Sequence, residues 1–143
     1  MKLLSLLELA LKSDEVIEVL EHYQISVVYD FDRLHENTPD VYWASSPQAG
    51  FELRFNEKQV LDTIFMYALP RGRFSHIEPN TTGLPFFRTF GEASTAFQEG
   101  GIPFRTSAKG DGWIKGHFGT HQIHYEFNSE GALSLVTLMA ADA

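Results

Sequence analysis

The fold is decided by the stretch Phe51-Glu52-Leu53-Arg54-Phe55-Asn56, which continues as Val60-Leu61-Asp62-Thr63-Ile64-Phe65-Met66-Tyr67-Ala68. The same pattern returns 72 positions later as Ile123-His124-Tyr125-Glu126-Phe127-Asn128 and Ala132-Leu133-Ser134-Leu135-Val136-Thr137-Leu138-Met139-Ala140. Four aligned pairs are identical, and most of the others keep their polarity. Similarity at a fixed spacing within one chain indicates a repeated architecture. The sequence therefore predicts two copies of one hairpin.

A helix signal precedes each copy. Val16-Ile17-Glu18-Val19-Leu20 matches Ala93-Ser94-Thr95-Ala96-Phe97 in spacing, at an offset of 77 positions. Ser13 is a suitable N-cap for the first helix, whereas we expect the second to run from about Glu92 to Glu99. The predicted class is α+β, with two tandem helix-plus-antiparallel-hairpin repeats, approximately 13–68 and 90–141, that form antiparallel sheet packed by helices. Residues 60–68 are apolar on both faces, which is typical of a central strand covered on both sides.

The second hairpin can be given a register. Gly119-Thr120 fits a two-residue turn with glycine first, which pairs Lys115 with His124 and Trp113 with Glu126. One face then carries polar side chains together with an indole: Trp113, Lys115, His117, Gln122, His124 and Glu126. The opposite face is mostly apolar, with His121 at its end: Ile114, Phe118, His121, Ile123, Tyr125 and Phe127.

The remaining segments complete one domain over residues 1–143. The run at 2–12 looks at first like a secretion signal, but Glu8 interrupts it and no small-residue cleavage site follows, so we expect a docking helix instead. Its apolar face would carry Leu3, Leu4, Leu7 and Leu11. Residues 69–89 read as a bridge between the copies. No stretch approaches the roughly 20 apolar residues that span a bilayer, and we expect no membrane association.

Composition narrows the classes of function. The chain has 143 residues and no cysteine, which excludes disulfides, cysteine-zinc sites and a thiol nucleophile and fits a cytoplasmic location. The net charge of −8 is uneven, since residues 1–70 carry −7 and residues 71–143 carry −1. Direct nucleic-acid binding requires the opposite sign. The acidity indicates either a basic protein partner or simply a soluble surface.

Two groups of side chains invite a metal hypothesis. His117, His121 and His124 lie close in sequence, but the hairpin register places His121 on the face opposite the other two, so the three do not converge as zinc requires. The acidic connector with Asp30, Asp32, Glu36 and Asp40 lacks the regular spacing and central glycine of a calcium loop. We therefore predict no metal and no cofactor, and we interpret the connector as a candidate electrostatic docking surface.

No arrangement of residues marks a catalytic centre. The chain has no Gly-x-Ser-x-Gly elbow and no phosphate loop, so we predict that it is not an enzyme. Trp43 and Trp113 stand near the starts of the two hairpins, where an indole is either covered by a helix or loop or exposed as a binding hot spot. The expected partner-binding residues are Asp30, Asp32, Glu36, Asp40, Tyr42, Trp113, His117 and His124.

Part of the chain resembles a known family. The residues are Thr82-Gly83-Leu84-Pro85-Phe86, Phe90-Gly91-Glu92-Ala93, Gly101-Ile102-Pro103 and the final stretch from His124 to Met139. They resemble small bacterial immunity proteins of polymorphic-toxin and contact-dependent competition systems. At the level of fold, the tandem copy also looks like secreted β-lactamase inhibitor proteins, although the chain has neither their disulfides nor a signal.

The resemblance implies a function in binding. A cytoplasmic immunity protein would bind a cognate toxin domain and occlude its active site, with an acidic surface against a basic cleft. The alternative is a small-ligand-binding protein or enzyme with a cavity between the repeats, in which His76, His117 or His124 would stand beside a carboxylate. A homodimer formed through a sheet edge is a further possibility.

Overall fold

The computed structural model describes residues 2–31 and 37–141 and confirms the α+β class. The first half contains the 3₁₀ helix η1 (Leu3–Leu6), α1 (Asp14–His22), β1 (Val27–Asp30), β2 (Val41–Ser46), β3 (Phe51–Phe55) and β4 (Leu61–Tyr67). The second part contains the 3₁₀ helix η2 (Pro79–Thr81), α2 (Phe90–Glu99), β5 (Phe104–Thr106), β6 (Trp113–His117), β7 (His121–Phe127) and β8 (Leu133–Ala140).

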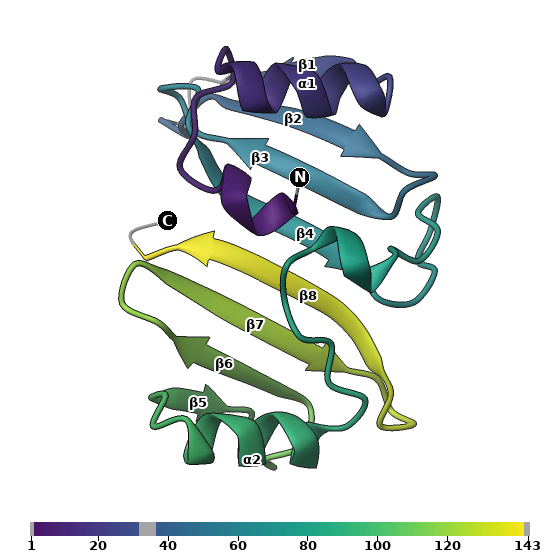
Figure 1. Cartoon of the computed structure of the whole chain (residues 1–143), viewed down its shortest axis with the longest axis vertical. Helices are drawn as coiled ribbons and strands as arrows, with labels where there is room; N and C mark the ends of the chain where they lie inside the picture. The colour runs from purple at the N-terminus through teal and green to yellow at the C-terminus, as the bar shows by residue number, and fades with distance from the viewer. Residues whose placement is uncertain (1, 32–36, 142–143) are drawn as a thin grey trace.

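All eight described strands form one antiparallel sheet in the order β1-β2-β3-β4-β8-β7-β6-β5. Figure 1 shows α1, α2 and both 3₁₀ helices on the same face of this sheet. The core lies beneath them, where Val16 and Phe97 from the two helices join Phe51, Ile64 and Tyr125 from the strands. The prediction that residues 60–68 form a central strand is correct, but the expected cover on both sides is wrong: no described helix lies on the second face.

The central strands pair in the same way on both sides of the sheet. Glu52 of β3 pairs with Phe65 of β4, and His124 of β7 pairs with Thr137 of β8, 72 positions further along. The register shifts between Arg54 and Phe55 in the first pair of strands and between Glu126 and Phe127 in the second, again 72 positions apart. Phe65 also pairs with Thr137 across the β4–β8 junction. The strand pairing therefore has an approximate two-fold symmetry about this pair.

Local capping explains where the helices begin. The Ser13 hydroxyl accepts a hydrogen bond from the Val16 N–H at 3.4 Å, as predicted. α2 starts two residues before the expected Glu92, because Thr89 and Glu92 form a reciprocal capping box. The predicted register of the second hairpin is confirmed, including the Lys115–His124 pair.

The expected docking helix over residues 2–12 is wrong. Only Leu3–Leu6 form a helical turn, and Glu8 adopts a left-handed conformation with φ of 68°. Beyond that point the backbone bonds to the start of β4 and the turn before it: Leu61 N–H donates to the Leu9 oxygen at 2.9 Å, and Leu11 N–H donates to the Gln59 oxygen at 2.7 Å. These bonds replace the helical ones, and the segment docks through the buried Leu3 and Leu6.

The bridge between the halves is held against the first hairpin. Ser75 N–H donates to Pro47 O at 2.8 Å, and Ile77 N–H donates to Tyr67 O at 2.7 Å. The segment passes so close to Gly50 that a β-carbon there would lie 2.5 Å from the Ser75 oxygen. Glycine at position 50 therefore allows the bridge to pass against the turn of the first hairpin. None of the described helices is long and apolar enough to span a membrane.

Candidate protein-binding surface

The face of the sheet opposite the helices is the candidate site, and we call it the open face. Side chains along a strand alternate between the two faces of a sheet. The buried core residues and the residues paired with them point to the helix side, and the residues next to them along each strand point to the open face. The open face carries aromatic, aliphatic and charged side chains: Trp43, Glu52, Arg54, Phe65, Tyr67, Trp113, Lys115, His117, Gln122, His124, Glu126, Leu135, Thr137 and Met139.

Aromatic side chains are spread across the open face. The rings of Trp43 and Phe65 lie 6.0 Å apart in the first half, and those of Trp113 and His124 lie 5.2 Å apart in the second. All four side chains are half-buried although no described helix covers them. Thr137 between them is only 8% exposed. The large side chains thus shield the centre of the sheet themselves, and they present their outer surfaces to solvent.

The charges on the open face are of mixed sign and partly paired. Arg54 lies 3.6 Å from Asp62, and the Ser45 hydroxyl donates to Glu52 at 2.8 Å. Lys115 and Glu126 flank His124 in the second half. An aromatic surface set among charges of both signs is typical of protein interfaces, whose energetic centres are rich in Trp, Tyr and Arg.

One corner of the open face is covered by the bridge. A turn closed by hydrogen bonds between Arg71 and Phe74 folds over the end of β4. The ring of Phe74 stacks on Tyr67 at 4.4 Å, and the Arg73 guanidinium lies 5.1 Å from the Phe74 ring centre. The surface available to a partner therefore extends from Trp43 to Trp113 rather than towards this corner.

His124 is a partly buried titratable group at the centre of the second half of the open face. Burial lowers the pKa of His124 below its ordinary value; Glu126 acts in the opposite direction, and Lys115 lowers the pKa further. The imidazole is therefore neutral at pH 7 and packs against Trp113 without carrying a charge into the surface.

Acid should weaken the fold through His124. Because the folded state holds the lower pKa, the unfolded chain binds the proton first as pH falls below about 6.5. The stability that neutral His124 contributes is complete above that pH and is lost as pH falls towards the folded-state pKa. We expect the urea midpoint of the wild type to fall more between pH 7.5 and pH 5 than that of His124→Gln. Equal slopes would contradict this role, since the other titrating groups are the same in both proteins.

The structure separates the predicted partner-binding residues into two groups. Trp113, His117 and His124 lie together on the open face, on β6 and β7. Asp30, Asp40 and Tyr42 lie on or next to β1 and β2, at the edge of the sheet remote from Trp113. Asp32 and Glu36 lie outside the described residues.

The group near β1 centres on Tyr29. Its hydroxyl donates to Asp40 at 2.7 Å, and its ring stacks on Tyr42 at 4.9 Å. The hydrogen bond to Asp40 raises the pKa of Tyr29 to about 12. Tyr42 pairs with Phe55 and so points to the helix side, away from the open face. The partner-binding residues expected from the sequence did not include Trp43, which the sequence marked only as a possible hot spot. They also did not include Phe65, for which the apolar pattern on both faces of residues 60–68 was the signal.

The histidines do not form a metal centre within the described residues, where no three His, Asp or Glu side chains are grouped to hold an ion. His121 faces the helix side and stacks on Phe118 at 5.1 Å, as the register predicted. His117 lies on the open face, and its Nε2 atom is buried without a hydrogen-bond partner among the described residues.

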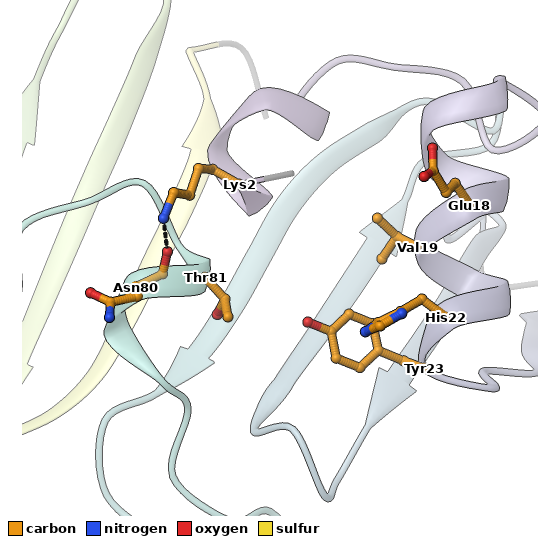
Figure 2. Close-up of a pocket in the computed structure, with 7 residues that line it drawn as sticks. All are labelled: Lys2, Glu18, Val19, His22, Tyr23, Asn80 and Thr81. Carbon is orange, nitrogen blue, oxygen red and sulfur yellow. Dashed lines mark hydrogen bonds between the residues drawn. The ribbon is translucent and has the colours of Figure 1, made fainter.

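A groove on the helix side bears on the alternative function. A hollow of about 360 Å³ lies between α1 and η2. Figure 2 shows the side chains that line it: Lys2, Glu18, Val19, His22, Tyr23, Asn80 and Thr81. The Lys2 ammonium donates to the backbone oxygen of Asn80 at its rim. A neighbouring hollow that shares Tyr23 holds His76 3.8 Å from Glu78, with both side chains mostly exposed. These hollows lie over the first half and the bridge.

Comparison of the chain with protein-family models, with curated proteins and with solved structures returned no match. A function for this chain is therefore inferred from its residues and from the geometry of the described surfaces.

Proposed function

We propose that this protein is an immunity protein that binds a toxin domain made by the same bacterial cell and occludes its active site, and that it is not an enzyme. The single observation that carries the proposal is the open face, where Trp43, Phe65, Trp113 and His124 lie on a sheet surface that no described helix covers. The resemblance of residues 82–139 to immunity proteins supports the same function. In this proposal the protein acts in the cytoplasm, before the toxin leaves the cell.

The size of the open face suits a stable complex. Eight strands at a spacing of about 4.8 Å, with three to eight residues each and about six on average at about 3.3 Å, give a surface of roughly 34 by 20 Å, or about 700 Å². A standard protein–protein interface buries about 800 Å² on each partner. The part of this face that the bridge leaves uncovered is therefore large enough to serve as much of one interface.

We also propose that the two halves are copies of one ancestral unit. The β3–β4 pairing recurs as the β7–β8 pairing 72 positions further along, with the register shift at the equivalent residue, and this supports a common origin. Trp43 pairs with Arg54, and Trp113 pairs with Glu126. The two partners, Arg54 and Glu126, lie 72 positions apart, so the two indoles occupy equivalent sites in the two halves. Duplication would have placed two hot-spot side chains on one continuous surface.

The test begins with the protein encoded by the adjacent upstream gene. We expect it to form a stable complex with this chain, and deletion of this chain to leave the cells sensitive to it. Trp43→Ala and Trp113→Ala should each weaken the complex by roughly 30-fold or more, because truncation of a hot-spot residue costs about 2 kcal/mol. The affinity is measured by calorimetry, with circular dichroism to confirm that each variant is folded.

His22→Ala is the matched control, because His22 lies in the groove on the other side of the sheet. It should leave the affinity unchanged. Unaltered binding by both Trp variants would show that the open face is not part of the interface. If neither a complex nor a sensitivity phenotype were found, the proposed function would be wrong.

The groove beside Tyr23 supports a second candidate function, the binding of a small ligand. Lys2 and Glu18 offer charges of both signs around one hollow, with the His22 and Tyr23 rings at its wall. A screen of small metabolites by ligand-observed NMR distinguishes the two functions. A ligand whose binding is lost in His22→Ala and kept in Trp113→Ala would favour this second function.

A further inference from the structure

The strongest unassigned feature is the outer edge of β1. Six large apolar side chains among the described residues are more than a third exposed, and five of them gather around this strand. Val28 is the most exposed at 61%, followed by Phe31 at 47% and Tyr29 at 45%. Val27 of the same strand and Ile17 of the adjoining helix α1 complete the set. Apolar surface of this kind, concentrated in one place, marks an interaction site.

The two edges of the sheet differ in how they are protected. An edge strand offers unpaired N–H and C=O groups to another chain, and proteins blunt such edges by shortening them or by placing Pro and positive charges there. β5 follows that rule, since it has three residues, follows Pro103 and exposes Arg105. β1 has four residues, all exposed, and carries neither proline nor a basic side chain.

The negative charge around β1 favours a basic partner. Residues 13–31 contain five acids, Asp14, Glu15, Glu18, Glu21 and Asp30, and no Lys or Arg. A second copy of the chain would bring two such surfaces together, and like charges disfavour that contact. A basic segment would be attracted instead. It would also find an apolar surface to pack against, because the chain adjoining α1 exposes Val27 and Val28.

The edge is continuous with the open face. Val28 pairs directly with Trp43, so both side chains point to that face, and the Trp43 ring reaches within 6.0 Å of Phe65. A strand added to β1 would therefore extend the open face rather than create a separate interface.

We propose that the outer edge of β1 accepts an extended, basic strand of the bound toxin domain, which continues the sheet as a ninth strand. The inference rests on the proposed function for the source of that strand. Main-chain hydrogen bonds supply the affinity in this mode of recognition, and alternate side chains supply the selectivity. The added strand would place its apolar side chains beside Val28 and its Lys or Arg side chains near the acids of α1.

The test uses a peptide probe that needs no toxin. A capped octapeptide of alternating Lys and Val should shift the amide resonances of Val27–Asp30 in ¹⁵N NMR spectra and slow their hydrogen exchange. The same peptide with N-methylated valines keeps the charge but loses hydrogen-bond donors, and it should bind at least 10-fold more weakly. A Glu-Val octapeptide should not bind.

Two variants of the protein complete the test. Val28→Lys should weaken the Lys-Val peptide by at least 10-fold, with little change in urea midpoint because Val28 is 61% exposed. Gln98→Lys introduces the same charge on the exposed side of α2 and should have no effect. Equal binding of the N-methylated peptide, or shifts confined to the acids of α1, would overturn the proposal. So would a concentration-dependent dimer in sedimentation that Val28→Lys abolishes.

The outcomes separate this inference from the proposed function. If the toxin domain binds and Val28→Lys leaves its affinity unchanged, the edge plays no part and the proposed function stands. If no toxin domain binds but the peptide adds to β1, the proposed function fails and the edge remains a strand-accepting site.

Discussion

Phe97→Ala is expected to lower the free energy of unfolding by about 3–5 kcal/mol, the range for deletion of a buried aromatic ring. Phe97 is 4% exposed and is the main anchor of α2. Its ring lies within 5.8 to 6.1 Å of four other rings, those of Phe87, Phe104, Phe118 and Tyr125. The neighbouring structure cannot readily collapse into the vacated space, because Phe104 on β5 and Tyr125 on β7 stand on strands that the sheet holds apart.

The contact with Gly116 makes this site unusually intolerant. A β-carbon at Gly116 would lie 2.9 Å from the edge of the Phe97 ring, so the ring occupies the space that the glycine leaves free. The measurement is urea unfolding followed by tryptophan fluorescence. Gln98→Ala, one residue further along the exposed side of α2, is the matched control and should change the unfolding free energy by less than about 0.5 kcal/mol. A loss below about 1 kcal/mol in Phe97→Ala would show that α2 is not anchored in this way.

Gly50→Ala is expected to destabilise the protein by roughly 2–5 kcal/mol through two effects. The first is conformational, because Gly50 has φ of +80° and a side chain in this region costs about 1–2 kcal/mol. The second is steric, because the new β-carbon would lie 2.5 Å from Ser75 O and 2.6 Å from Ile77 N. Overpacking of this kind costs about 1–3 kcal/mol, and here the atoms that must move belong to the backbone.

Gly72→Ala separates the two effects. Gly72 also has a positive φ, of 58°, but a β-carbon there would meet no atom within 4 Å. It should therefore show the conformational cost alone. If Gly50→Ala proves no more destabilising than Gly72→Ala, the bridge does not press on the first hairpin. If Gly50→Ala fails to express, hydrogen exchange of the Ile77 amide in the wild type gives an independent measure of how firmly the bridge is held.

Local patterns in the sequence were enough to predict the second hairpin. The glycine at 119 fixed the turn, and strict alternation of apolar residues fixed the faces, so the pairing of Lys115 with His124 is as expected. The grouping of Trp113, His117 and His124 on one face followed from the same register. These features depend on residues close together in the chain, where turn chemistry and side-chain period act directly.

The arrangement of the whole sheet depends on distant contacts and could not be predicted in the same way. Only the pairing of β4 with β8 decides that β1 and β5 become the edges. That pairing moves Asp30 and Asp40 to the side of the sheet remote from Trp113, although the sequence suggested one shared binding surface. The apolar pattern of β4 suggested a cover on both faces, whereas in the structure neighbouring large side chains on the open face perform that role.

The β4–β8 junction has a consequence for how the chain reaches this structure. The two strands at the middle of the sheet are separated along the chain by η2, α2, β5, β6 and β7, so the central hydrogen bonds are also among the last that can form. Contacts between remote parts of a chain slow folding and prolong the life of partly folded states. During that interval the inner edge of β4 exposes unpaired backbone groups, as the outer edge of β1 does in the folded protein, so the first half is prone to aggregation until the second half has been made.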